Sequence, residues 1–226
     1  MAARSREAAT APAPPGVVYA VVKRTVDVVL SAIGLLVASP IIAVVAVAVR
    51  LTMGSPVLWR QARSGKEGHP FLLTKFRTMR PPTDAEVGPA SDAARITRLG
   101  RVLRATSADE LPSLWNVLSG DMSLVGPRPL PTQYLPRYSR EEAMRLDVRP
   151  GLTGWAQIHG RNDQSWERRF ELDLWYVRHR RLRLDLSILL RTPFQVLARQ
   201  GIARPGYATM PEFTGHGGGE ERSDDA

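Results

Sequence analysis

A run of 22 consecutive uncharged residues, from Val28 to Val49, constrains the fold more than any other feature of this sequence. The run is long enough to cross the hydrocarbon core of a bilayer as one helix. Basic residues flank it on both sides, Lys23 and Arg24 before it and Arg50 after it. Because positive flanks favour the cytoplasmic side of a membrane, these charges predict that both ends of the run lie on the same side.

A break in the middle of the run would reconcile its length with its flanking charges. Pro40 cannot donate a backbone hydrogen bond and its ring crowds the preceding turn, so it bends or interrupts a helix. The hydroxyl of Ser39 can satisfy a carbonyl that the proline frees. We therefore expect a re-entrant membrane helix–break–helix over residues 17–52. The alternatives are a kinked helix that spans the bilayer and a signal peptide cleaved at Ala46-Val47-Ala48.

The charge balance indicates anionic partners. The chain has 226 residues, which suits one domain with appendages, and a formal net charge of +9. Acidic residues gather in the last eight positions, so the rest of the chain is more basic still. Phosphorylated substrates, anionic lipids and nucleic acids are the partners that such a charge attracts. The sequence contains no cysteine, which excludes disulfides, thiolate zinc sites and cysteine nucleophiles.

The remaining pattern predicts a mainly helical α/β fold with short strands. We expect disorder at residues 1–16 and 214–226 and a small cytoplasmic globular catalytic domain at 53–213. Two short strands are expected around a glycine-containing turn, followed by helices. The last two helices are amphipathic, and their apolar faces either meet the membrane interface or pack on the core. The expected strands are 57–60 and 70–74, and the expected helices are 95–104, 109–119, part of 134–146, a stretch from 166 to 177, and 184–198.

Two adjacent carboxylates, Asp109 and Glu110, begin one of these helices between two arginines. Arg104 precedes them, and Arg128 follows in a Gly-Pro-Arg-Pro turn. A helix N-terminus with arginines suits a phosphate, and two acids beside a phosphate imply a divalent cation between them. The alternative is structural, because Ser107 and Glu110 also fit a helix capping box.

Several short motifs follow one another along the chain in a fixed order. They are Lys23-Arg24, Ser39-Pro40, Lys75-Phe76-Arg77-Thr78-Met79, Asp109-Glu110-Leu111-Pro112, Gly120-Asp121-Met122-Ser123, Gly126-Pro127-Arg128-Pro129 and Arg149-Pro150-Gly151. This order resembles the bacterial sugar transferase family, the small monotopic polyprenyl-phosphate phosphoglycosyl transferases. Two further segments, Gly160-Arg161-Asn162 and Phe170-Glu171-Leu172-Asp173, are similar to the members that start N-linked glycans with diacetylated bacillosamine.

This resemblance implies an enzyme that moves a phosphosugar from a UDP-sugar to polyprenyl (undecaprenyl) phosphate. UMP is released, and the product initiates membrane-linked glycan assembly. By the same resemblance Asp109 is the nucleophile and forms a covalent aspartyl–phosphosugar intermediate. It also implies Mg²⁺ held by Asp109 and Glu110. Lys75, Arg104 and Arg128 would neutralise the substrate phosphates.

The resemblance assigns further expectations to the rest of the chain. Arg149, Pro150 and Gly151 are expected to hold the nucleotide, and Lys23 and Arg24 to seat the helix in the membrane. The expected partners are a UDP-sugar, polyprenyl phosphate, membrane lipids and downstream glycosyltransferases, with no nucleic acid. The expected location is the cytoplasmic face of the bacterial inner membrane. The sequence leaves open the sugar, the prenyl length and the glycan pathway.

Two other functions remain open at this point. A membrane-associated metal-dependent phosphohydrolase would use the same acids and metal with water as the acceptor. A non-enzymatic basic protein that binds nucleic acid or anionic membranes would explain the charge and the apolar run, but not the paired acids beside the Gly-Pro-Arg-Pro turn.

Overall fold

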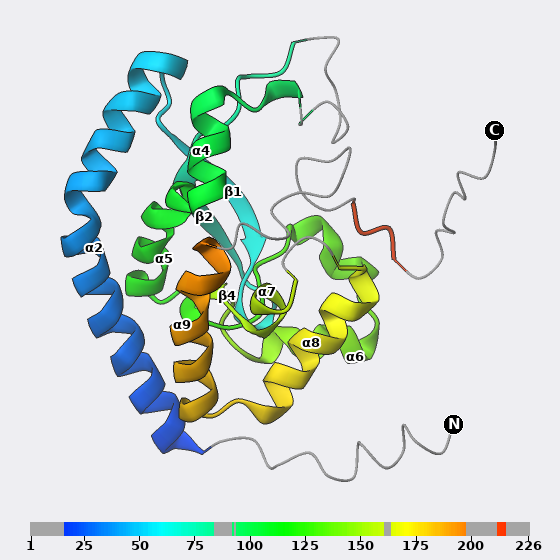
Figure 1. Cartoon of the computed structure of the whole chain (residues 1–226). Coiled ribbons are helices and arrows are strands. Elements are labelled where there is room, and N and C mark those ends of the chain that lie inside the picture. Colours follow the sequence, from blue (N-terminus) through cyan, green and yellow to red (C-terminus); the bar gives the residue numbers. More distant parts are fainter. Residues whose placement is uncertain (1–15, 84–91, 93, 161–163, 198–211, 216–226) are drawn as a thin grey trace.

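The computed structural model describes residues 16–83, 92, 94–160, 164–197 and 212–215, so the two predicted disordered ends lie almost wholly outside it. The chain begins with one long helix, α2 (Val17–Met53), that runs along the side of a smaller domain of helices and short strands (Figure 1). The mainly helical class with short strands, predicted from the sequence, is confirmed.

Helix α2 is continuous, so the predicted break at Ser39 and Pro40 is wrong. Pro40 lies inside the helix and leaves the carbonyl of Leu36 without its usual amide donor. The hydroxyl of Ser39 donates to that same carbonyl at 2.7 Å. Because the serine replaces the missing hydrogen bond, the proline does not end the helix.

The N-terminal half of α2 is fastened to the domain by polar contacts. The carboxylate of Asp185 in helix α9 (Leu182–Leu197) accepts hydrogen bonds from Lys23 at 3.0 Å and from Tyr19 at 2.9 Å. The guanidinium of Arg24 donates to two carbonyls at the end of helix α5 (Leu114–Ser119), at 2.7 and 3.0 Å. The two basic residues expected to seat the helix in the membrane therefore bind the protein itself.

The C-terminal end of α2 is held by apolar packing and by one buried arginine. Val45 and Val49 pack with Phe76 and Leu103 in a cluster of buried side chains. Arg77 donates to carbonyls at the end of α2 and just beyond it, including that of Ser55 at 3.0 Å. Such donors satisfy carbonyls that the last helical turn leaves unpaired. Helix α2 is thus attached to the domain at both of its ends.

Two small sheets form the centre of the domain. Strands β1 (Leu58–Ser64) and β2 (Pro70–Phe76) form an antiparallel hairpin, as predicted, and the 3-10 turn η1 (Lys66–Gly68) joins them. Strands β3 (Ser123–Val125) and β4 (Gly151–Thr153) pair in parallel. A Cβ on Gly151 would lie 2.1 Å from the backbone nitrogen of Gly126, so this close approach of two backbones requires glycine.

Short helices connect and cover these sheets. The largest core cluster includes Val117, Met122, Val125, Tyr176 and Ile188, and it joins α5, β3, α8 and α9. The predicted helix 109–119 divides into a 3-10 turn and a short α-helix. The remaining elements are α4 (Arg98–Thr106), η2 (Ala108–Ser113), η3 (Thr132–Arg137), α6 (Arg140–Ala143), η4 (Met144–Asp147), α7 (Trp155–Ile158) and α8 (Trp166–His179).

The two amphipathic helices at the end of the chain differ in what they bury. The apolar stripe of α8 lies in the core, with Phe170, Leu174 and Val177 all buried. Helix α9 buries one side, but Leu190 and Phe194 are 62% and 72% exposed. The apolar face of α8 therefore packs on the core, whereas α9 leaves part of its apolar face exposed on the surface of the molecule.

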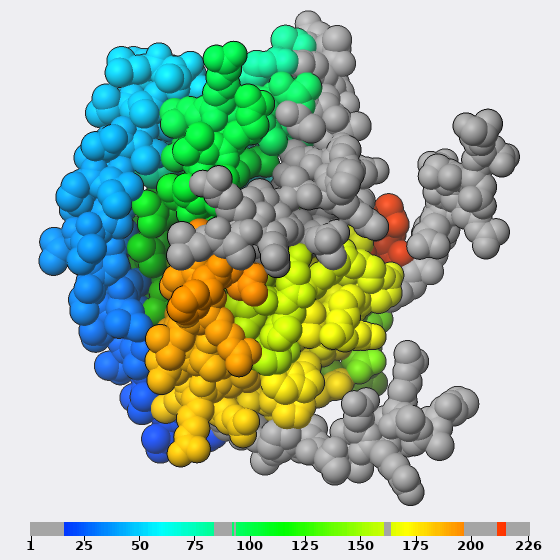
Figure 2. Space-filling model, in the orientation of Figure 1, coloured from blue at the N-terminus to red at the C-terminus, as the bar shows by residue number. Residues whose placement is uncertain are grey.

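Helix α2 also exposes an apolar surface, on the side turned away from the domain. It is long and apolar enough to cross a membrane, by length and composition, and little of its most apolar stretch is buried. In Figure 2 it forms one edge of the molecule, beside α9. The large side chains exposed along it include Val18, Ile33, Leu36, Val37, Ile41, Val44, Val47 and Leu51.

Candidate active site

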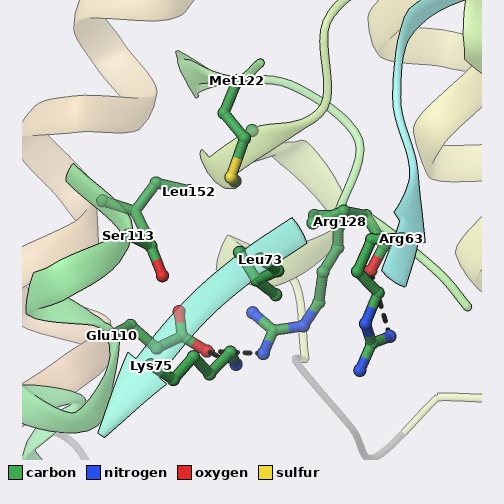
Figure 3. A pocket seen from close by; sticks show the side chains of 10 residues that line it. Arg63, Leu73, Lys75, Glu110, Ser113, Met122, Arg128 and Leu152 are labelled. Atoms are coloured by element: carbon green, nitrogen blue, oxygen red, sulfur yellow. Dashed lines mark hydrogen bonds and ion pairs between the residues drawn. The ribbon is translucent and has the colours of Figure 1, made fainter. Parts of the chain in front are cut away.

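Glu110 lies between two cations from distant parts of the chain. Its Oε1 accepts a hydrogen bond from Lys75 at 2.7 Å and another from Arg128 at 2.6 Å, as Figure 3 shows. Burial acts to raise the pKa of Glu110, but the charges of Arg128 and Lys75 and their hydrogen bonds outweigh it and hold that pKa well below its usual range. Glu110 is therefore an anion at neutral pH.

Side chains of η2 and α5 fix the strand that carries Lys75. The hydroxyl of Ser113 donates to the carbonyl of Thr74 at 2.7 Å. The side chain of Asn116 accepts from the amide of Thr74 at 3.1 Å and donates to the carbonyl of Leu72 at 2.9 Å. These bonds satisfy the edge of β2 that faces away from β1, and they bring Lys75 to Glu110.

A buried ion pair holds the turn that carries Arg128. Arg145 of η4 binds Asp173 of α8 at 2.8 Å, and both side chains are 2% exposed. The same guanidinium donates to the backbone carbonyl of Arg128 at 2.7 Å. Removing either partner would leave an unpaired buried charge, which destabilises a fold strongly. The pair therefore fixes the position of the Gly-Pro-Arg-Pro turn.

Asp109 differs from its neighbour because, within the described part of the chain, no cation binds it directly. It is 9% exposed and forms no hydrogen bond or ion pair with any residue that the structure describes. Burial, and second the charge of Glu110, raise the pKa of Asp109 to about 6. At neutral pH this carboxylate is mainly ionised and its oxygens are available to a substrate.

Arg104 lies at the end of α4, close enough to Asp109 for their charges to interact. Its Nε donates to the hydroxyl of Thr78 at 3.0 Å. Thr78 belongs to the Lys75-to-Met79 motif, so one segment supplies Lys75 to the site and also orients Arg104. Burial lowers the pKa of Arg104.

The capping-box alternative for Ser107 and Glu110 is wrong. Ser107 makes no side-chain capping bond and has a left-handed backbone with φ of 57°. The acidic pair begins a 3-10 turn rather than an α-helix, and Glu110 turns toward Lys75 and Arg128. The site is therefore built on side-chain charges and not on the N-terminus of a helix.

These groups line one large cavity of about 950 Å³. Asp109, Glu110, Lys75, Arg104 and Arg128 all border it. A cavity of this size can enclose a substrate larger than a phosphate group. Its lining comes mainly from β1, the end of β2 with the segment 77–82 that follows it, η2 and α9.

Two further arginines of this cavity, Arg63 and Arg169, are absent from the sequence-based assignment. Burial, and the nearby charge of Arg128, lower the pKa of Arg63 to about 10. Burial likewise lowers the pKa of Arg169 to about 10, although Asp173 opposes this effect. The sequence contained one usable signal, because Arg169 falls on the apolar face of α8 beside Phe170.

The structure places Arg149 outside this group. Its side chain is exposed, donates to the carbonyl of Gly120 at 2.8 Å and does not line the cavity. Pro150 and Gly151 act through their backbones, since the carbonyl of Pro150 accepts from Ser123 and the amide of Gly151 donates to Pro127. A role of this segment in holding the nucleotide stays a prediction.

Asp109 and Glu110 fit Mg²⁺ as a site of two carboxylates that the substrate and water complete. Among the described residues no group of three or more acidic or histidine side chains could hold a metal ion. Mg²⁺ commonly binds one or two carboxylates and completes its coordination with substrate phosphates and water. No described cation is bound to Asp109, so its carboxylate could serve as such a ligand. Lys75 and Arg128 both bind Oε1 of Glu110, so its Oε2 could serve as a second ligand.

Comparison with known proteins identifies the family. The model of the bacterial sugar transferase family matches residues 18–199. The uncharacterized sugar transferase EpsL of Bacillus subtilis is 48% identical over 197 residues, which cover 87% of this chain and 98% of EpsL. The UDP-glucose:undecaprenyl-phosphate glucose-1-phosphate transferase of Caulobacter vibrioides is 43% identical over 182 residues, 75% of this chain and 67% of that protein.

A longer relative is the undecaprenyl-phosphate galactose phosphotransferase of Salmonella typhimurium. It is 39% identical over 197 residues, which cover 79% of this chain but only 41% of the relative. The chain thus spans about two fifths of that protein. The fold and site describe a mainly helical enzyme whose cavity joins two acidic side chains with several basic ones. The chain belongs to the bacterial sugar transferase family, which confirms the resemblance seen in the sequence.

Proposed function

We propose that this chain transfers a phosphosugar from a UDP-sugar to undecaprenyl phosphate with release of UMP. The observation that carries the proposal is that the two adjacent carboxylates at the cavity wall differ in the cations that bind them. Glu110 is bound by Lys75 and Arg128, whereas none of the described cations is bound to the neighbouring carboxylate of Asp109. The names of the relatives from Caulobacter vibrioides and Salmonella typhimurium support the same reaction class.

In the first step, a carboxylate oxygen of Asp109 attacks the β-phosphorus of the donor. The bond between this phosphorus and the bridging diphosphate oxygen breaks, and UMP leaves with that oxygen. The product is a phosphosugar bound to Asp109 as an acyl phosphate. An ionised carboxylate needs no general base, so the protein has mainly to neutralise charge on the phosphates.

In the second step, a phosphate oxygen of the lipid attacks the same phosphorus. The bond from this phosphorus to Asp109 breaks, which restores the carboxylate and leaves a lipid diphosphosugar. Lys75, Arg104 and Arg128 would stabilise the charge of both transition states, and guanidinium groups match phosphate oxygens in pairs. The positive charge of Arg63 and Arg169 on the same cavity supports binding of a second anionic substrate.

We also propose that Asp109 and Glu110 hold Mg²⁺ when the donor is bound. The ion would neutralise charge on the diphosphate, which carboxylates alone would repel. The test is removal of divalent cations with a chelator, which should abolish UMP release, followed by restoration with Mg²⁺. Unchanged release after chelation would remove the metal from the scheme.

The membrane arrangement is the third part of the proposal. The apolar surface of α2 and the family both indicate membrane association. Both ends of α2 bind the same globular domain, which favours a helix whose two ends face the same side of the membrane. The basic flanks favour the cytoplasmic face.

Impermeant thiol labelling of intact cells tests this arrangement. Single cysteines placed near Ala2 and after residue 60 should both be protected until the membrane is permeabilised. Labelling of the first cysteine alone would show that α2 spans the membrane. Because the chain has no native cysteine, the unsubstituted protein is the background control.

A screen for UMP release across UDP-sugars tests the reaction itself. With undecaprenyl phosphate and Mg²⁺ present, one or more donors should yield UMP and a lipid-linked sugar. Free sugar phosphate without a lipid product would instead indicate the phosphohydrolase, an activity that the names of the three relatives do not include. Absence of UMP with every donor would contradict the proposal.

A further inference from the structure

Gln157, in the short helix α7, is a buried polar residue that the proposed reaction leaves unused. It is 8% exposed, and neither its Oε1 nor its Nε2 has a hydrogen-bond partner in the part of the chain that the structure describes. A buried amide without partners costs folding free energy, because it gives up water without replacing the lost hydrogen bonds. Such groups are rare in native proteins, and this one needs an explanation other than packing.

The position of Gln157 connects it to the phosphate-binding part of the site. It lines the same cavity as Glu110 and Arg128. A Cβ on Gly154 would lie 2.6 Å from Oε1 of Gln157 and 2.1 Å from the carbonyl oxygen of Gly126. The amide therefore lies against the backbone that packs on the Gly-Pro-Arg-Pro turn. Gly126 and Arg128 are two positions apart in the chain, a Cα distance of at most roughly 7 Å.

The surroundings of Gln157 combine its amide with an apolar wall. Helix α7 packs against α9, and the hydroxyl of Thr153, at the end of β4 just before α7, shares a hydrogen bond of 2.8 Å with that of Thr192 in α9. Leu189 and Pro193 of α9 line the same cavity. An apolar wall that carries a few polar groups is the usual composition of a site for a small organic molecule.

We propose that Gln157 is a recognition residue for the sugar-nucleotide donor. Its amide would form paired hydrogen bonds with an adjacent donor and acceptor on a part of the substrate that does not react. A carboxamide offers an N–H donor and a C=O acceptor side by side. Two parts of a UDP-sugar match this pattern, the imide edge of uracil and neighbouring polar groups of the sugar. This inference rests on the function proposed above.

The proposal predicts opposite effects of one substitution on stability and on catalysis. Gln157→Leu removes the unpaired amide at similar volume, so the Tm should stay the same or rise. The same variant loses the paired hydrogen bonds, so kcat/KM for the donor should fall on the order of 10- to 100-fold, mostly through KM. Gln157→Glu keeps the shape but removes the N–H donor, and it should show a comparable loss.

Gln164 provides a matched control. It is also 8% exposed, and its Oε1 has no partner among the described residues, but its Nε2 donates to the carbonyl of Ala156 at 3.0 Å and it does not line the cavity. Gln164→Leu should lower the Tm, because it removes a buried hydrogen bond to a carbonyl that then keeps only the amide of His159 as its donor, and should leave the KM for the donor unchanged. The two glutamines thus separate a recognition role from a packing role.

Inhibition by UMP distinguishes the two parts of the donor. If Gln157 contacts uracil, Gln157→Leu should raise the inhibition constant of UMP by the same factor as the KM. If it contacts the sugar, the inhibition constant should stay constant while the ranking of UDP-sugars changes. A folded, active Gln157→Leu enzyme with the wild-type KM for the donor would overturn this inference alone. A wild-type protein that releases no UMP from any donor would overturn the proposed function as well.

Discussion

Two segments of this chain carry the same Ser-x-x-Glu pattern and use it differently. At Ser139 and Glu142 the pattern forms a complete capping box, in which each side chain bonds the backbone of the other residue. At Ser107 and Glu110 no capping bond forms, and the glutamate instead binds Lys75 and Arg128. One segment stabilises the start of a helix, and the other supplies an anion to the cavity.

The difference arises from contacts that are distant in sequence. Lys75 and Arg128 lie 35 and 18 residues from Glu110, and two charge-assisted bonds outweigh one local cap. Ser107 has a left-handed backbone, whereas Ser139 has the extended backbone usual for an N-cap. The local Ser-x-x-Glu pattern therefore allows either a capping role or a role in the cavity, and the tertiary contacts determine which one the glutamate has.

The largest loss of activity is expected from a substitution of Asp109, which lies beside Glu110 in the segment that lines the cavity. Asp109→Asn should abolish UMP release, even without a lipid acceptor, because an amide is a poor nucleophile. The measurement is a single-turnover assay with purified enzyme and UDP-sugar. Asp147→Asn, at an exposed site outside the cavity, is the control and should keep normal turnover. Near-normal release by Asp109→Asn would remove this residue from the proposed role.

The second prediction compares the two glutamates directly. Glu110→Gln should lower the rate of UMP release on the order of 10²-fold or more, because the anion between the two cations is lost. Glu142→Gln changes a capping contact outside the cavity and should cost about 1 kcal/mol of folding free energy with little effect on turnover per folded molecule. Equal loss of turnover in both variants would contradict the distinction between the segments.

The third prediction concerns pH and Asp109. Because the pKa of Asp109 is raised from 3.8 to about 6, its reaction should slow about tenfold per pH unit below that value. Lys75 acts to lower this pKa, so Lys75→Met should move the acidic limb of the rate profile to higher pH. A limb that stays in place in that variant would show that Asp109 does not control the profile.

The same pKa shift has a consequence for stability. The native state binds more protons than the unfolded chain between pH 3.8 and about 6, so Asp109 contributes stability below pH 3.8 that is lost as the pH rises through about 6. Asp109→Asn should remove this part of the pH dependence. Denaturant unfolding at several pH values measures it without any substrate. An unchanged pH dependence in the variant would contradict the raised pKa.

The smallest expected effect concerns the two serines. Ser139→Ala should lower the free energy of unfolding by about 1 kcal/mol, because its hydroxyl accepts from the amide of Glu142. Ser107→Ala should change it much less, since Ser107 makes no capping bond. Urea unfolding of both variants checks this comparison. A larger loss at Ser107 would mean that its hydroxyl stabilises the turn in another way.

Much of the fold and the charged centre of the cavity could be predicted from the sequence. The apolar run, the hairpin at β1 and β2 and the acidic pair depend on local patterns, so their elements were found. The break at Pro40 was wrongly predicted, because a single bond from Ser39 to Leu36 decides it. Arg63 and Gln157 were missed, because only tertiary packing brings them to the cavity wall. Arg169 was missed although its place on the apolar face of α8 is a signal in the sequence.

In the proposed mechanism, Asp109 carries the phosphosugar between the two steps. Incubating the enzyme with labelled UDP-sugar and Mg²⁺ but no lipid, and then mapping the label by peptide mass spectrometry, tests this step itself. We expect a phosphosugar on Asp109 that disappears when undecaprenyl phosphate is added. Label on another residue, or an active enzyme that is never labelled and reacts only when both substrates are present, would contradict it.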